Sequence, residues 1–400
     1  MSQFSHLELQ PADEFNDLRI KLANDSDPNK IDVSIGVYRG EDGNSFTLPV
    51  VRRAKALYHE ENYGHDYTFC LGLPDFVQNA AKVIIGETLV SKKLVASCQT
   101  IGGTGACHLG ALFLSQSSGY KNFYLGVPAW PNYLPLIKQA GGTVTTYSYY
   151  DTEKKQVDFN AMLRSLNAAP AKSVFILQLC CHNPTAADLT IEQWSQVAEI
   201  MKKRDLIPFI DAAYQGFATG SMETDGLPIQ KFIEVGCEVV VCQSFSKNLG
   251  LYGERLGCLH VVVNDVAHTP LVLDQLRYMY RAECSSSPAY GARLMALITK
   301  NDELLTQWKK DLQDMSSRLR TTRATVYELL TEKYKTPGTW EHVKTQRGLF
   351  WYSGLTEQQS KKLLDEHHVF LPKSGRVNVA GLSDRNVDSF CAAFDAVVRS

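Results

Sequence analysis

The sequence predicts an α/β protein in which a mainly parallel sheet is covered by helices and a smaller α/β unit follows. Short apolar runs alternate with amphipathic segments from about residue 94 to residue 260, which is the rhythm of β-α-β units. The helical pattern from 288 to 334 is longer than one ordinary helix. From 340 onward the chain alternates strand and helix again, which indicates the second unit.

The expected strands of the larger unit are its apolar runs, 122–127, 143–150, 173–179, 208–211 and 238–242. The helices between these strands carry their own start signals. The string Thr190-Ile-Glu-Gln193 is typical of a capping box and opens a helical segment that reaches Arg204. Such alternation favours a parallel sheet with both faces covered.

The long helical segment is expected to break at Asn301-Asp302, after which Leu304, Trp308 and Leu312 repeat at helical spacing. We expect this helix to bridge the two units. In the tail we expect strands and helices in alternation, with strands at 348–352, 369–371 and 376–379 and helices at 358–368 and 384–398.

The composition excludes several classes of function. The 400 residues are 44% hydrophobic and 21% charged, as in a globular protein with a sizeable core. Because 41 basic and 43 acidic residues nearly cancel, no overall field favours nucleic acid or an acidic membrane. The apolar runs are far shorter than the ~20 residues of a membrane span. The ten cysteines show no metal-binding or redox spacing, and the N-terminus lacks a leader pattern, so we expect a cytoplasmic protein without a metal that acts on small molecules.

A glycine-rich stretch at residues 99–106 lies between a strand-like run and a helical run at 107–114. A turn of this kind exposes backbone N–H groups at a helix start and can hold a phosphate. It matches neither of the common nucleotide-binding patterns. On its own, a plain tight turn explains it equally well.

Asp211 ends one apolar strand and Lys247 follows another, which places both at the carboxyl edge of a parallel sheet. Each alone is explained as well by a helix cap or a solvated charge. Together with a phosphate cradle, however, they are the parts that hold an aldehyde cofactor: the lysine for the aldehyde and the acid for a ring nitrogen. Arg255, eight positions beyond Lys247, adds a guanidinium suited to phosphate oxygens.

Four strings extend this pattern along the chain: His182-Asn-Pro-Thr185, Asp211-Ala-Ala-Tyr214-Gln-Gly-Phe217, Gln243-Ser-Phe-Ser-Lys247-Asn-Leu-Gly-Leu-Tyr252-Gly-Glu-Arg255 and Ser374-Gly-Arg376. They closely resemble the aspartate aminotransferases, which belong to the pyridoxal phosphate (PLP) fold-type-I superfamily, and the likeness runs from Ile35 to the C-terminus. The resemblance implies PLP as cofactor, amino acid and 2-oxo acid substrates, and a homodimer with shared active sites.

The resemblance also implies the domain plan. A large PLP-binding domain with a mainly parallel, seven-stranded sheet is expected at residues 47–315, and a smaller α/β domain at 15–46 and 316–400, after an N-terminal arm at 1–14.

Carried over by this resemblance, Lys247 would hold PLP as a Schiff base and move the substrate proton, and Asp211 would pair with the pyridine nitrogen. Trp130 would stack on the ring, and Asn183 and Tyr214 would donate to its phenolic oxygen. Six residues would hold the phosphate, the last of them from the other subunit: Gly103, Thr104, Ser244, Ser246, Arg255 and Tyr67.

The substrate would be held at both ends. Its α-carboxylate would meet Arg376, Asn183 and the backbone of Gly36, with Trp130 alongside, and Arg281 would reach across the dimer to the distal carboxylate. The expected catalytic residues are Lys247, Asp211 and Tyr67.

Four positions depart from the family's usual pattern. Gly102 stands where serine is common, Tyr133 and Gln178 stand where histidines often support the aspartate, and Ala186 replaces a glycine. None removes a main catalytic group, but each bears on how the cofactor is tuned.

Two other functions stay open on the sequence. An aromatic amino acid aminotransferase of the same subfamily shares nearly every motif, and a catalytically silent PLP-fold protein could act as a binding module. The joint presence of Lys247, Asp211, Arg255 and Arg376 argues against the silent protein. A nucleotide-binding enzyme is disfavoured because the P-loop lysine is missing.

Overall fold

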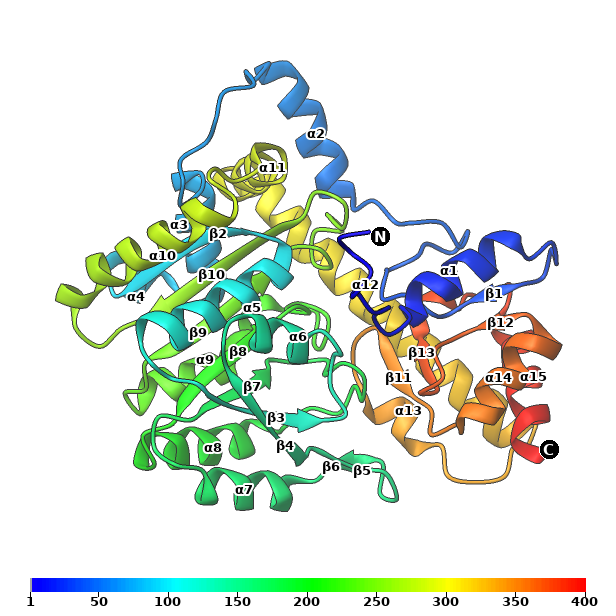
Figure 1. Cartoon of the computed structure of the whole chain (residues 1–400). Helices are drawn as coiled ribbons and strands as arrows, with labels where there is room; N and C mark the ends of the chain where they lie inside the picture. Colours follow the sequence, from blue (N-terminus) through cyan, green and yellow to red (C-terminus); the bar gives the residue numbers. More distant parts are fainter. Residues whose placement is uncertain (1) are drawn as a thin grey trace.

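The computed structural model describes residues 2–400. A large part is built around a central sheet, and a smaller part formed by segments from near both ends of the chain lies beside it, with helix α12 running from one to the other (Figure 1). Among the described residues, no helix has both the length and the hydropathy that crossing a bilayer requires.

The central sheet has seven strands in the order β2-β10-β9-β8-β7-β3-β4, which confirms the predicted fold class. All neighbouring pairs are parallel except the two that β10 makes, with β2 and with β9. The strands are β2 (Val95–Ile101), β3 (Asn122–Val127), β4 (Thr143–Ser148), β7 (Val174–Gln178), β8 (Ile207–Ala212), β9 (Val239–Ser244) and β10 (Leu256–Val262). The loop 245–255 is shorter than a parallel crossover needs, which explains why β10 turns back.

Helices cover both faces of this sheet, as the alternating apolar runs predicted. Ile210 and Cys258 belong to the hydrophobic core on one face, whereas Phe209 and Leu259 belong to the core on the other. The main helices of this part are α2 (Pro49–Glu61), α3 (Pro74–Ile84), α5 (Gly102–Leu112), α6 (Tyr133–Gln139), α7 (Phe159–Ala168), α8 (Ile191–Lys203), α9 (Met222–Glu234), α10 (Thr269–Glu283) and α11 (Ala289–Lys300).

Two helices, α8 and α5, show how the local sequence determines where a helix begins. The capping box predicted at Thr190 opens α8. In contrast, α5 begins at Gly102, earlier than the expected start at 107, because the glycine-rich stretch itself forms the first helical turn. That shift brings the first backbone N–H groups of α5 to the end of β2.

The bridging helix breaks where it was predicted to break. Asn301 caps α12 (Asp302–Glu328) by accepting a hydrogen bond from the N–H of Leu304. The indole of Trp308, which is fully buried, donates to the backbone oxygen of Asn248 at 2.7 Å. The bridging helix therefore anchors the loop that follows β9.

The smaller part joins the two ends of the chain. Strand β1 (Ile31–Asp32) pairs in parallel with β12 (Val369–Phe370), and β11 (Phe350–Tyr352) pairs with β13 (Arg376–Asn378). Its helices are α1 (Glu14–Asn24), α13 (Glu341–Thr345), α14 (Glu357–His367) and α15 (Val387–Arg399). These elements agree with the strand and helix alternation expected for the tail, and the exact domain boundaries stay predictions.

Three histidines are buried in this fold, and burial lowers the pKa of each of them, His182, His260 and His342, to about 3. His260 lies on β10, where one ring nitrogen is 2.8 Å from the Ser97 hydroxyl and the other is 3.0 Å from the Gln243 side-chain oxygen. A neutral ring satisfies both contacts. Between pH ~6.5 and pH 3 these histidines bind protons in the unfolded chain and stay neutral in the folded chain. The free energy of unfolding is therefore highest above pH ~6.5 and decreases as the pH falls towards 3.

We predict that His260→Gln reduces this acid sensitivity. Between pH 7 and pH 5 the parent should lose roughly 2 kcal/mol of unfolding free energy through His260 alone, and the variant should not. Urea unfolding of the cofactor-free protein at one protein concentration measures this difference. The matched control is His59→Gln, because His59 is exposed. An equal loss in parent and His260→Gln would contradict the account.

Candidate active site

The predicted site residues meet at one edge of the central sheet, where the parallel strands end. Gly103 and Thr104 follow β2, Trp130 follows β3, and Asn183 follows β7. Asp211 lies in β8 next to its end, Ser244 ends β9, and Ser246 and Lys247 follow it, while Arg255 immediately precedes the antiparallel β10. In open α/β sheets this edge is where ligands bind. One topological feature thus gathers residues spread over more than a third of the chain, from 103 to 255.

Two glycines let the start of α5 approach this edge closely. A Cβ at Gly103 would lie 2.8 Å from the Cβ of Ser244, and a Cβ at Gly102 would lie 2.5 Å from a guanidinium nitrogen of Arg255. Gly102 also has φ +66°, which disfavours serine there. The departure at Gly102 is therefore explained by the space that Arg255 occupies.

After Gly102, whose N–H donates to the Arg255 backbone oxygen at 2.8 Å, the first turn of α5 presents N–H groups without a side-chain cap. Its N-cap residue, Ile101, has no side chain that can accept a hydrogen bond, and the turn holds no acidic residue. The Arg255 guanidinium donates to the Ser246 hydroxyl at 3.4 Å and to the Tyr252 backbone oxygen at 3.1 Å. Helix N–H groups, two serine hydroxyls and a guanidinium together form a cradle suited to a phosphate dianion.

Asp211 is buried and accepts a hydrogen bond from the Tyr133 hydroxyl at 2.5 Å. Burial raises the pKa of its carboxyl to about 6, while the Tyr133 hydrogen bond and the charge of Lys247 act in the opposite direction. Of the two positions where histidine was expected to support the aspartate, the structure thus fills one with a phenol that makes the same kind of contact.

Lys247 is partly buried, and its amine lies 5.2 Å from the centre of the Tyr214 ring. Burial lowers the pKa of this amine to about 8, Asp211 opposes that change, and the charges of Arg255 and Arg376 add to it. Near physiological pH a larger fraction of this amine is therefore neutral than in an exposed lysine, and the neutral form is the one that reacts with an aldehyde and accepts a proton.

Arg376 joins the two parts of the molecule at this site. Its guanidinium donates to the Asn183 side-chain oxygen at 3.0 Å and to the Ser34 backbone oxygen at 2.7 Å. The guanidinium carbon also lies 4.1 Å from the Phe350 ring centre. Gly36 packs on the same ring, because a Cβ there would come within 2.7 Å of it.

The cation of Arg376 is buried without an ion-pair contact, and the charge of Glu14, which acts on it, does not offset the burial. Arg376 is 6% exposed, its Nε has no hydrogen-bond partner, and no carboxylate in residues 2–400 lies within ion-pair distance of it. Burial lowers its pKa to about 10. An unpaired buried guanidinium favours an incoming anion.

Two predicted residues lie apart from this group. Tyr67 is 95% exposed, and Arg281 is exposed at the end of α10, where it donates to the Ser285 backbone oxygen at 3.3 Å. The Thr68 hydroxyl bonds to Ser286 and Ser287, which ties the Tyr67 segment to the loop after Arg281. Both side chains therefore stand on one continuous surface of the chain.

Of the remaining departures, Gln178 has a local explanation, whereas nothing in the structure explains Ala186. Gln178 does not bond to Asp211; it exchanges two hydrogen bonds with the backbone of Asn183, at 2.8 Å and 3.0 Å, and so fixes that residue. Ala186 has φ +53°, a backbone conformation in which glycine is less strained. Phe350, beside Arg376, was missed by sequence reasoning, because an aromatic in a short strand looks like core.

PLP fits these residues by their chemistry. The cradle on α5 matches its phosphate, the desolvated amine of Lys247 matches its aldehyde, and the buried carboxylate of Asp211 matches a protonated ring nitrogen. The edge-on packing of Trp130 against Tyr133, with ring centres 5.2 Å apart, places an aromatic surface beside Asp211.

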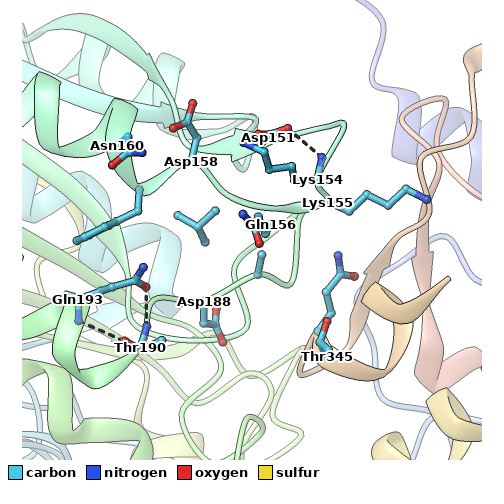
Figure 2. A pocket seen from close by; sticks show the side chains of 14 residues that line it. Asp151, Lys154, Lys155, Gln156, Asp158, Asn160, Asp188, Thr190, Gln193 and Thr345 are labelled. Atoms are coloured by element: carbon cyan, nitrogen blue, oxygen red, sulfur yellow. Dashed lines mark hydrogen bonds and ion pairs between the residues drawn. The ribbon is translucent and has the colours of Figure 1, made fainter. Parts of the chain in front are cut away.

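A separate hollow of about 490 Å³ lies beside the 150–158 hairpin, between the starts of α7 and α8 and the end of α13 (Figure 2). None of the predicted site residues line it. Its polar side chains bond within the protein: Lys154 pairs with Asp151, Thr190 with Gln193, and Asp188 accepts two backbone N–H groups. The chemistry therefore lies at the strand ends and not in this hollow.

Comparison with known proteins agrees with that geometry. The family model for aminotransferases of class I and II matches residues 28–394. The cytoplasmic aspartate aminotransferase of Saccharomyces cerevisiae is 39% identical over 406 residues, covering 99% of this chain and 97% of that protein.

Solved structures give the same picture. The aspartate aminotransferase from the cytoplasm of Saccharomyces cerevisiae has a TM-score of 0.96 at 38% identity, covering 99% of this chain and 98% of that one. The aromatic-amino-acid aminotransferase from Burkholderia pseudomallei, solved covalently bound to pyridoxal phosphate, has a TM-score of 0.96 at 35% identity and covers 100% of both chains. The chain therefore belongs to the aminotransferases of class I and II.

Proposed function

We propose that this protein is a PLP-dependent aspartate aminotransferase, which moves the amino group of L-aspartate to 2-oxoglutarate and yields oxaloacetate and L-glutamate. The observation that carries the proposal is the partly buried Lys247 amine beside the Tyr214 ring, on which the charges of Asp211, Arg255 and Arg376 act. Since the yeast relative is named cytoplasmic, we propose the same compartment for this chain.

The cofactor would be held at three points. Gly103, Thr104, Ser244, Ser246 and Arg255 would bind its phosphate, Lys247 its aldehyde carbon, and Asp211 its ring nitrogen, while Asn183, Tyr214 and Trp130 would contact the ring and its phenolic oxygen. Bound there, PLP supplies an electron sink that stabilises negative charge at the substrate's Cα.

Lys247 would then act as the group that moves the proton. Its lowered pKa places it near neutral pH, where a general base is most effective because it is both available and basic enough. Asp211 stays ionised above its pKa of about 6 and so keeps a positive charge on the ring nitrogen. At physiological pH the carboxyl is therefore ionised, and the amine has a larger neutral fraction than an ordinary lysine.

The unpaired guanidinium of Arg376 is suited to the substrate's α-carboxylate. Two of its nitrogens each donate one hydrogen bond, to Asn183 and to Ser34, which fixes the plane of the guanidinium and leaves a second N–H on each of them to donate. A carboxylate bound bidentately would orient Cα–H relative to Lys247, and orientation of this kind accounts for much of enzymatic rate enhancement. The backbone of Gly36 lies in the same corner.

Tyr67 and Arg281 would act in the second subunit of a homodimer. They are exposed, and Arg281 is not among the charges that act on Lys247 in its own chain. Large side chains beside them, Phe69 and Tyr278, are 70% and 71% exposed, as expected for a surface that a second copy covers. Tyr67 would reach the neighbouring phosphate, and Arg281 the distal carboxylate of the substrate.

One rival keeps the chemistry and changes the substrate. The Burkholderia aromatic-amino-acid aminotransferase supports an aromatic substrate. Its TM-score equals that of the yeast aspartate aminotransferase, and its sequence identity is lower. A guanidinium at the distal end of the substrate separates the two functions, because only a diacid has a charge there to pair with it.

The first prediction identifies the lysine. After borohydride reduction of the PLP-loaded protein, mass spectrometry should find the cofactor on Lys247, and Lys247→Ala should slow transamination by at least ~10²–10⁴ because the base is lost. Lys155→Ala is the matched control, since Lys155 is another partly buried lysine. A Lys247→Ala rate within tenfold of the parent, ~1.4 kcal/mol of barrier, would show the assignment to be wrong.

The second prediction concerns the diacid. Arg281→Leu should lower kcat/KM for aspartate by roughly 30- to 5000-fold, because removing one partner of a desolvated charge pair costs ~2–5 kcal/mol. Alanine and tyrosine should lose far less. Arg277→Leu serves as control, because Arg277 is exposed and pairs with Asp274 within its own helix.

Hybrid dimers test the placement of Arg281 across the subunit boundary. Mixing Arg281→Leu with Lys247→Ala subunits should recover one intact site per hybrid. An unchanged preference for aspartate over alanine in Arg281→Leu would refute the role, and hybrids without recovered activity would refute the placement.

A further inference from the structure

Residues 34–38, with Gly36 at their middle, are held from both parts of the molecule. From the smaller part, Arg376 and Asn378 of β13 donate hydrogen bonds to three backbone oxygens of this segment, at 2.7 Å, 2.7 Å and 2.9 Å. None of these bonds uses an N–H group of the segment. The Gly36 N–H has no acceptor in residues 2–400, so it is free to donate to an anion.

Tyr38 attaches the segment to the large part. Its N–H donates to the hydroxyl oxygen of Tyr252 at 2.9 Å. Among the hydrogen bonds that residues 34–38 make in the described chain, this is the only one to the large part. The Tyr38 ring packs edge-on against Phe46 and Phe217, with ring centres 5.5 Å and 6.3 Å apart. Because Tyr38 is 4% exposed, its N–H depends on this one phenol oxygen for a partner.

Tyr252 belongs to the loop that runs from Lys247 to Arg255. The backbone oxygen of Lys247 accepts a hydrogen bond from the Gly250 N–H at 3.0 Å, which closes a turn within this loop. The backbone oxygen of Tyr252 accepts from the Arg255 guanidinium at 3.1 Å, whereas its side chain contacts Tyr38. One residue thus contacts both the group that would hold the phosphate and the segment that would receive the substrate's α-carboxylate.

We propose that Tyr252 is a positioning residue whose hydroxyl holds the backbone of residues 36–38 against the loop that carries Lys247. It thereby aligns the Gly36 N–H and the Arg376 guanidinium, which would bind the substrate's α-carboxylate, with the amine that would act on Cα–H. The Tyr252 side chain serves the substrate and its backbone serves the phosphate, so a substitution separates the two contributions. The inference rests on the proposed function, because it takes this α-carboxylate site as given.

Tyr252→Phe tests the role of the hydroxyl, because it keeps the ring and removes only the oxygen that accepts from Tyr38. Without that contact the segment is in its binding position for part of the time, and the apparent affinity for substrate falls by that fraction. In the half-reaction of the PLP-loaded protein, the aspartate concentration for half-maximal rate should rise about 10-fold, which corresponds to ~1.4 kcal/mol. The maximal rate should stay within about twofold of the parent's.

Alanine distinguishes this effect from that of a residue at the distal carboxylate. Its half-saturating concentration should rise by the same factor as that of aspartate, because both substrates have an α-carboxylate. A rise for aspartate without a rise for alanine would place the effect of Tyr252 at the distal end of the substrate and overturn the inference.

Hydrogen exchange of the cofactor-free protein measures the contact without any catalytic activity. The Tyr38 amide should be protected in the parent and exchange at least ~10 times faster in Tyr252→Phe. The Val33 amide, which donates to the Phe370 backbone oxygen at 3.0 Å, is the internal reference and should not change. PLP affinity should also be unchanged, because the contact with Arg255 comes from the Tyr252 backbone.

Tyr150→Phe is the matched control. Tyr150 is 6% exposed, belongs to the large part and also accepts a hydrogen bond from the smaller part, from the Gln346 side chain at 3.4 Å. Its partner lies outside residues 34–38, so this variant should keep the parent's half-saturating concentrations and its Tyr38 exchange rate. An equal loss of substrate affinity in Tyr150→Phe and Tyr252→Phe would attribute the effect to any loosened contact between the two parts and overturn the specific role of Tyr252.

The remaining outcomes separate this inference from the proposed function. If the parent transaminates aspartate and Tyr252→Phe keeps the parent's half-saturating concentration, the role of Tyr252 is refuted and the proposed function stands. An unprotected Tyr38 amide in the parent would refute the contact without any variant. If the parent transaminates no amino acid, the proposed function and the inference fail together.

Discussion

The hydrogen bond from Arg376 to Asn183 is the contact on which the rest of the site depends, because it joins the C-terminal part of the chain to the central sheet. The same guanidinium holds Ser34 from the N-terminal segment, so three distant segments meet at one cation. Burying that cation without a carboxylate partner opposes folding by several kcal/mol. The chain retains it at the one place where an anionic substrate would supply the missing charge.

Burial shifts the pKa values of Asp211 and Lys247, the two groups that would act on the cofactor and substrate, in opposite directions. The same desolvation raises the pKa of the Asp211 carboxyl to about 6 and lowers that of the Lys247 amine to about 8. Between about pH 6 and pH 8 the carboxyl is ionised, and the neutral form of the amine, which can act as a base, increases towards pH 8. Because the strands that carry the two residues are adjacent, each charge moderates the shift of the other.

Much of this arrangement could be predicted from sequence, because it depends on the alternation of apolar runs and on which residues follow them. The run at 122–127 became β3 without change, and Asp211 and Lys247 were placed at the sheet edge from the strands before them. The reversed direction of β10 could not be predicted, since it follows from the length of the 245–255 loop in a sheet that is otherwise parallel.

Contacts between residues distant in the sequence could not be predicted either. Gln178 and Tyr133 occupy equivalent positions in the sequence argument, yet one holds the backbone of Asn183 and the other bonds to Asp211. Only their tertiary contacts distinguish them, because Tyr133 at the start of α6 reaches β8, whereas Gln178 at the end of β7 reaches the loop that follows its own strand. In the same way, glycine is required at position 102 because Arg255, which is distant in the sequence, packs against it and leaves no room for a side chain.

The most direct test of the central claim is the half-reaction of the PLP-loaded protein, followed through the absorbance of the bound cofactor. Aspartate, glutamate, tyrosine and alanine would be offered in turn without a 2-oxo acid. The account predicts that aspartate and glutamate convert the cofactor at much lower concentrations than alanine, because only a diacid engages both Arg376 and Arg281. Conversion by alanine as readily as by aspartate, or no change with aspartate, would contradict it.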